Sequence, residues 1–96
     1  MRIKRSTGNV FRDIGFPPTE AENLRVRAEL MVEIENYLLR EGLTQAEAAR
    51  RFGVTQPRIS DLKRGRIDLF SVDGLMEMLG RAGLSVRIRV ERPRAA

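Results

Sequence analysis

The sequence has no cysteine and no histidine. Without cysteine the chain has no disulfides, no cysteine-based zinc site and no thiol chemistry. Without histidine it lacks the side chain that most often serves as a general base or as a metal ligand. Only two lysines are present, Lys4 and Lys63, and the sequence shows neither a glycine-rich phosphate loop nor a cluster of metal-ligand residues. We therefore expect neither an enzyme nor a cofactor.

Long apolar runs are also absent. No run approaches the roughly 20 residues that cross a bilayer, and the N-terminus has no secretory apolar core. We therefore expect no membrane segment and a cytoplasmic location. The chain has 96 residues, of which 42% are hydrophobic and 32% charged, which is typical of one small globular domain. A domain of this size buries a limited share of its surface, so a dimer would add stability.

Charge is unevenly distributed along the chain, whose net charge is +5. Residues 17–41 hold six acids and three bases, whereas residues 42–70 hold six bases and three acids. A basic segment beside an acidic helix can orient a protein on a polyanion such as nucleic acid. The distribution is also compatible with an unevenly charged solvated surface.

Four helices are predicted between residues 19 and 83. Each follows a serine or threonine that can cap its N-terminus, and each stops near a glycine. The expected helices and caps are 20–41 (Thr19), 45–52 (Thr44, with Glu47 at capping-box spacing), 56–64 (Thr55) and 72–82 (Ser71). The inner stripe of the first helix is expected to contain Leu24, Ala28, Met31, Ile34 and Leu38. These helices would form one all-α domain over residues 19–83.

Residues 1–18 are predicted to form an N-terminal arm without helical periodicity. The arm is too apolar for a simple linker, because it carries Val10, Phe11, Ile14 and Phe16. It is therefore expected to dock on a protein partner, on a second protomer or on its own helices. Three bases at its tip, which would add contacts to DNA or to a partner, are Arg2, Lys4 and Arg5.

Residues 84–91 are predicted to form a C-terminal strand, with a tail at 92–96. The apolar residues that alternate with polar ones are Leu84, Val86, Ile88 and Val90. A lone strand cannot satisfy its own backbone N–H and C=O groups. The predicted partner is the same strand of a second copy, which would hold a homodimer, and the arm around Val10 and Phe11 is the competing partner.

The segment 44–64 has the residue spacing of a helix-turn-helix. Ala49 is small where the two helices would cross, and Gly53 suits a turn with positive φ. Ile59 and Leu62 are three residues apart and would face inward together. The alternative is a helical hairpin in the core of a bundle.

Two stretches of this segment resemble a known family. Thr44–Ala49 (TQAEAA) and 53–62 (GVTQPRISDL), followed by Gly65, resemble the Cro/C1-type (XRE) helix-turn-helix family. The resemblance covers about residues 24–83 and implies a Cro/C1 repressor-like bundle. Residues 8–11 (GNVF) and 14–16 (IGF), with the tail after Gly65, resemble the branch that holds HigA-like antitoxins. Family repressors usually end in a fifth helix, where this sequence predicts a strand.

The resemblance also implies which residues bind DNA. The helix that begins at Gln56 would lie in the major groove, where Gln56 suits adenine and Arg58 suits guanine. The implied base contacts are Gln56, Arg58, Ser60 and Asp61. The implied phosphate contacts are Gln45, Thr55, Lys63, Arg64 and Arg66. Two alternatives stay open: Asp61 could pair with Arg58 or Lys63 within its own helix, and Gln45 could be an ordinary first residue of a helix.

These observations together predict a transcriptional repressor that binds a palindromic operator in double-stranded DNA as a homodimer, on the nucleoid. The antitoxin resemblance implies that it represses its own toxin–antitoxin operon and binds a RelE/HigB-like toxin. One alternative is a stand-alone or phage-type regulator without a toxin. Another is an interaction protein whose main role is to silence a partner, with DNA binding secondary.

Overall fold

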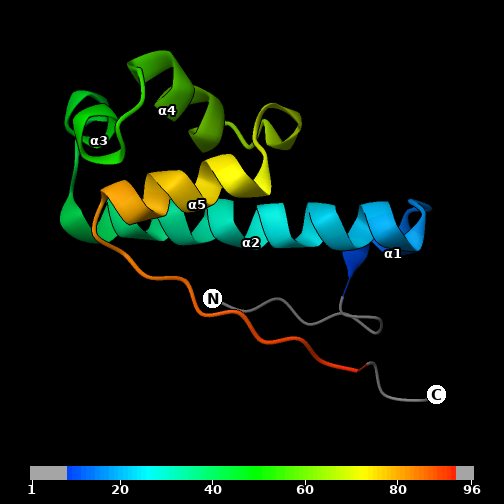
Figure 1. The fold of residues 1–96 in the computed structure, drawn as a ribbon. Coiled ribbons are helices and arrows are strands. Elements are labelled where there is room, and N and C mark those ends of the chain that lie inside the picture. Colours follow the sequence, from blue (N-terminus) through cyan, green and yellow to red (C-terminus); the bar gives the residue numbers. More distant parts are fainter. Residues whose placement is uncertain (1–8, 93–96) are drawn as a thin grey trace.

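A computed structural model describes residues 9–92, which form a bundle of helices (Figure 1). The elements are α1 (Val10–Asp13), α2 (Pro18–Glu41), α3 (Gln45–Phe52), α4 (Gln56–Lys63), the 3₁₀ helix η1 (Ile67–Leu69) and α5 (Val72–Arg81). The long α2 forms one layer, α5 lies along it, and α3 packs against both α4 and α5. None of the helices within residues 9–92 is long and apolar enough to span a bilayer. The predicted contacts of Arg2, Lys4 and Arg5 lie outside the described residues.

The four predicted helices are confirmed, as α2 to α5. The predicted capping box of α3 is present: the Glu47 amide donates to the Thr44 hydroxyl, and the Thr44 amide donates to the Glu47 carboxylate. The Ser71 hydroxyl accepts from the amide of Gly74 and caps α5. Gly42 ends α2 with a φ of 62°, a left-handed conformation that glycine adopts without steric cost.

The predicted cap at Thr19 is wrong, and the one at Thr55 is correct in position only. The helix α2 begins at Pro18, with Pro17 at the cap position, and Thr19 lies inside the first turn. Proline fixes φ near the helical value and has no N–H that needs a partner, so this helix starts without a side-chain cap. Thr55 does occupy the cap position of α4, but its hydroxyl makes no capping hydrogen bond. The Thr55 carbonyl accepts from Arg58 and Ile59 and completes the first turn.

The hydrophobic core joins α2, α3, α4 and α5. The predicted stripe on α2 is buried except for Ala28, which is half-buried. The largest fully buried side chains are Ile34, Phe52, Ile59, Leu62 and Leu75. The rings of Tyr37 and Phe52 meet edge to face, with centroids 5.6 Å apart. Because Ile59 and Leu62 reach this core, α4 is held by its inner face and its outer face is left to solvent.

The predicted C-terminal strand is wrong. Residues 84–92 are extended, but they pair with no other part of the described chain and form no strand. Leu84 and Val86 are half-buried against the core, whereas Ile88 is 72% and Val90 is 93% exposed. The alternation is real, but a strand also needs a second backbone to accept and donate hydrogen bonds, and within residues 9–92 none pairs with this segment.

The arm docks on the chain's own α2, one of the three alternatives that the sequence left open. Asn9 is 6% exposed, caps α1 by accepting from the Phe11 amide at 3.0 Å, and donates to the Ala21 carbonyl at 3.2 Å. The rings of Phe11 and Phe16 meet edge to face. The exposed apolar side chains of the arm are Val10, Ile14 and Phe16. The helix α1 was not predicted, because a four-residue helix is too short to show periodicity.

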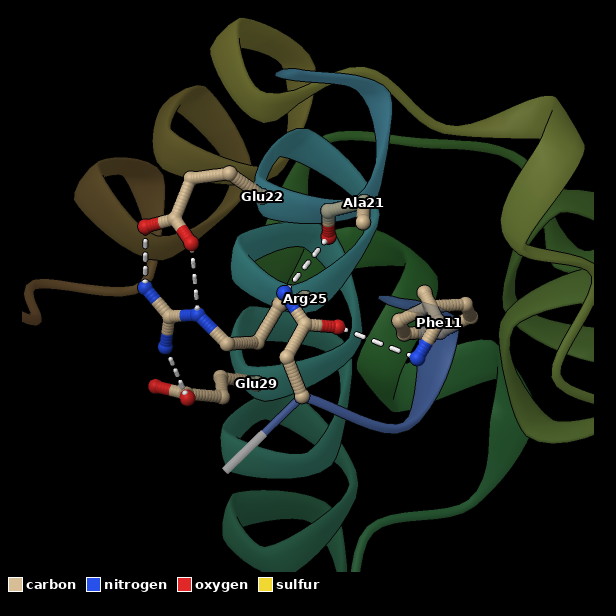
Figure 2. Close-up of polar contacts among 6 residues, drawn as sticks. Phe11, Ala21, Glu22, Arg25 and Glu29 are labelled. Atoms are coloured by element: carbon tan, nitrogen blue, oxygen red, sulfur yellow. Dashed lines mark hydrogen bonds and ion pairs between the residues drawn. The ribbon is translucent and has the colours of Figure 1, made fainter. Parts of the chain in front are cut away.

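Ion pairs on α2 lie beside this contact. Figure 2 shows the Arg25 guanidinium held between the carboxylates of Glu22 and Glu29. Hydrogen bonding to Arg25 holds the pKa of the Glu22 carboxyl below its ordinary value, and the same bond raises the pKa of Arg25. Because these side chains are partly exposed, the pairs add little to stability.

Candidate nucleic-acid interface

The helices α3 and α4 form the predicted helix-turn-helix, which lies at one edge of the molecule (Figure 1). Ala49 is buried where the helices meet, and its carbonyl accepts from the Val54 amide at 2.9 Å. Gly53 ends α3 with a φ of 71°. A Cβ at this position would lie 2.5 Å from Cδ of Arg81, which reaches over the turn from α5. The left-handed backbone conformation therefore favours glycine, and the flexible Arg81 side chain would also have to move aside for a Cβ.

Replacing Gly53 with alanine is expected to destabilise the fold by about 1–2 kcal/mol, because a non-glycine residue is strained in the left-handed region and Arg81 must move aside. Chemical denaturation monitored by circular dichroism measures this loss. Gly80→Ala is the control, because a Cβ at Gly80 meets nothing within 4 Å. Equal stability of the Gly53 and Gly80 variants would contradict this account of the turn.

The outer face of α4 carries the exposed polar residues of the motif. Gln56 and Pro57 are exposed in its first turn, Ser60 is half-buried, and Lys63 is exposed at its end. Gln56, Ser60 and Arg64 are spaced four residues apart, so they follow one face of the helix. The amide, hydroxyl and guanidinium groups on this face are of the kinds that can contact base edges and phosphates.

Asp61 forms an ion pair with Arg64, which the sequence predicted as a phosphate contact and not as a partner of Asp61. Its carboxylate lies 3.0 Å from the Arg64 guanidinium, and the two side chains are 24% and 63% exposed. The alternative of a pair with Arg58 or Lys63 within the helix is therefore not what the structure has, because the partner is Arg64 at the C-cap of α4. The pair brings a predicted base contact and a predicted phosphate contact together at the end of α4.

Arg58 points away from this outer face. Its guanidinium donates to the Leu69 carbonyl at 2.6 Å and lies over the ring of Phe70, with 4.0 Å between the guanidinium carbon and the ring centroid. The side chain is half-buried. The spacing of Gln56 and Arg58 in the sequence indicates this orientation, because residues two apart on a helix point about 200° apart around its axis. Arg58 is therefore nearly opposite to Gln56.

Arg27 was missed by the sequence reading and contacts the same segment from α2. Its guanidinium donates to the Ile67 carbonyl at 3.1 Å and to the Phe70 carbonyl at 3.2 Å. Its Nε also donates to the Asn23 amide oxygen at 2.8 Å. The local sequence pattern does not predict these contacts, because Arg27 is 40 and 43 residues away from its partners in the sequence.

The remaining predicted phosphate contacts surround α4. Gln45 and Thr55 are exposed at the N-termini of α3 and α4. Arg66 follows Gly65, whose φ is 72°, and lies 3.7 Å from the Asp68 carboxylate. The hydrogen bond from the Thr44 amide, which belongs to the capping box at the start of α3, holds the pKa of the Glu47 carboxyl below its ordinary value.

Comparisons with known proteins agree with this geometry. A family model described as a helix-turn-helix domain matches residues 10–91. A solved structure named as a member of the XRE family of transcriptional regulators is 32% identical, with a TM-score of 0.72. The match covers 80% of this chain and 90% of that chain. No match was found among curated proteins. The chain belongs to the XRE family of helix-turn-helix, DNA-binding transcriptional regulators.

Proposed function

We propose that the protein is a sequence-specific repressor that places α4 in the major groove of an operator. The observation that carries this proposal is the outer face of α4, where Gln56 and Ser60 are accessible beside Arg64. Gln56 would pair with adenine through its amide, and Ser60 and Asp61 would contact neighbouring bases. Gln45, Thr55, Lys63, Arg64 and Arg66 would contact the phosphates on either side.

The predicted guanine contact of Arg58 stays a prediction. In the free protein its guanidinium is occupied by the Leu69 carbonyl and the Phe70 ring, so a guanine contact would require the release of both. Gln56 and Ser60 need no such release, whereas Asp61 would have to leave its ion pair with Arg64.

Replacing Arg64 or Arg66 with alanine is expected to weaken binding to every DNA sequence. Each side chain that neutralises a phosphate releases a counterion, so each variant lowers the slope of log affinity against log salt by about one unit. Titrations of a mixed-sequence duplex at several salt concentrations measure the slope. Arg40→Ala is the control, because Arg40 is exposed at the end of α2. An unchanged slope in both the Arg64 and the Arg66 variant would show that these two side chains are ordinary solvated residues.

A homodimer is part of the proposal. A dimer would place two α4 helices on half-sites about one DNA turn apart, as a palindromic operator requires. The side chains available for it on the C-terminal segment are Ile88 and Val90, which are large, apolar and exposed. Leu84 and Val86 are already packed against the chain's own core.

We further propose that the protein is the antitoxin of a toxin–antitoxin operon. The resemblance of residues 8–16 to HigA-like antitoxins supports this role, as do the exposed apolar side chains of Val10, Ile14 and Phe16 beside α1. Co-expression with the product of the neighbouring gene, followed by size-exclusion chromatography, tests it. A stable complex that forms with the toxin-sized neighbour supports the antitoxin. Operator binding without any such complex would favour a stand-alone regulator.

A further inference from the structure

The segment that follows α4 is held from two sides. We name residues 64–70 the η1 loop, which carries the proposed phosphate contacts Arg64 and Arg66. Three carbonyls of this loop, those of Ile67, Leu69 and Phe70, accept hydrogen bonds from arginine side chains. One of these arginines stands on α2 and the other on α4, so the loop is attached to both layers of the bundle.

We propose that Arg27 and Arg58 are positioning residues that hold the η1 loop in the conformation that presents Arg64 and Arg66 to DNA. The consequence for DNA rests on the proposed function, whereas the holding of the loop does not. Charged donors make stronger hydrogen bonds to carbonyl groups than neutral donors do. A 3₁₀ helix of three residues has few hydrogen bonds of its own, so these outside donors decide its stability.

The Phe70 ring makes the contact of Arg58 geometrically specific. Phe70 is buried, and the guanidinium covers one face of its ring at 4.0 Å. A cation at this distance is attracted by the electrons of the ring face. The planar guanidinium donates to Leu69 while it stacks on the next residue, which a lysine ammonium reproduces poorly.

The position of Arg58 on α4 agrees with this role and opposes base reading. Arg58 lies four residues from the buried Leu62 and nearly opposite to Gln56. Arg27 stands on α2, in the layer away from α3 and α4, and therefore outside the proposed DNA-binding face (Figure 1). A residue on α2 that supports the loop acts on DNA binding only through the loop.

The test compares Arg27→Met and Arg58→Met in the full chain, with Arg40→Met as the control that removes the same charge from an exposed site. Methionine keeps an apolar stem but donates no hydrogen bond. In the absence of DNA, hydrogen exchange at the amides of Leu69 and Phe70 is expected to accelerate in both variants, with the protection of α3 unchanged. Unchanged exchange at these two amides would overturn the proposal.

The second readout uses two duplexes, one of mixed sequence and one from the protein's own promoter. Both variants are expected to lose about tenfold in affinity for both duplexes and about one unit of salt slope. A loss in Arg58→Met that is confined to the promoter duplex, with no effect of Arg27→Met, would overturn the proposal in favour of base reading.

Two further outcomes are separated by the same design. If the wild-type protein binds neither duplex, the proposed function fails, and the exchange rates still decide whether the arginines hold the loop. If Arg58→Met does not fold, Arg58→Lys replaces it, because it keeps the charge and the stem. Faster exchange of the Leu69 amide in that variant supports the proposal, and wild-type exchange overturns it.

Discussion

Replacing Gln56 with alanine is expected to cost about 1–3 kcal/mol of binding free energy on the operator and little on mixed-sequence DNA. Gln56 is exposed in the first turn of α4, on the face that carries Ser60. Its side-chain amide offers an NH2 group that can donate to N7 of adenine and a carbonyl that can accept from the N6 amino group. Because mixed-sequence binding depends on phosphates, removal of this amide leaves it almost unchanged.

Fluorescence anisotropy on matched operator and mixed-sequence duplexes at the same salt concentration measures both losses. Gln45→Ala is the matched control, because it removes the same side chain from the start of α3, where a phosphate contact is proposed. That variant is expected to lose affinity for both duplexes. If Gln56→Ala also lost equally on both, Gln56 would not be reading a base.

The second large effect is expected from Ile88→Asp combined with Val90→Asp. Both side chains are exposed, so the change leaves the packing of Leu84 and Val86 against the core intact. Paired charges at these positions oppose burial against a second copy, and the protein is expected to become monomeric. Loss of one of two linked half-site contacts lowers operator affinity by about 100-fold or more.

Sedimentation velocity measures the assembly state, and thermal unfolding checks that the fold is retained. Arg87→Asp combined with Arg89→Asp is the control, because it adds acids to the intervening positions without touching an apolar side chain. A double Ile88 and Val90 variant that stayed dimeric at nanomolar concentration, with wild-type operator affinity, would show that this segment does not hold a dimer.

Local signals predicted most of the helices. Capping and termination act within one or two turns, so Thr44 with Glu47, and Gly42 and Gly53, could be read directly from their spacing. The inward residues Ile59 and Leu62 followed from helical periodicity in the same way. The helix-turn-helix is predictable because all of its requirements lie within about 20 residues.

The wrong predictions concern elements whose structure depends on a distant part of the chain, or on neighbouring residues that favour a different start of the helix. The alternation in residues 84–90 was read correctly, but no backbone lies beside it in the described chain. Thr19 is a good capping residue, yet the preceding prolines start the helix earlier. The helix α1 depends on Asn9, whose buried hydrogen bond to Ala21 spans 12 residues.

At the candidate site, the exposed face of α4 could be predicted from the sequence. The contacts that hold the neighbouring η1 loop and turn in place could not. The contacts of Arg27 and Arg58 with the η1 loop, and of Arg81 with Gly53, join elements that are distant in sequence. An arginine in a basic motif suggests nucleic acid by composition alone. Its actual partner is decided by the side of the helix on which it stands and by the carbonyls that the fold places there.

The most direct test of the central claim is a nuclease footprint of the full chain across its own promoter, beside the same experiment with Gln56→Ala. Recognition of an operator through α4 predicts a protected palindromic segment with half-sites about one helical turn apart, and loss of that protection in the variant at the same concentration. Uniform binding along the DNA without a protected segment, or the same footprint from both proteins, would contradict sequence-specific recognition through α4.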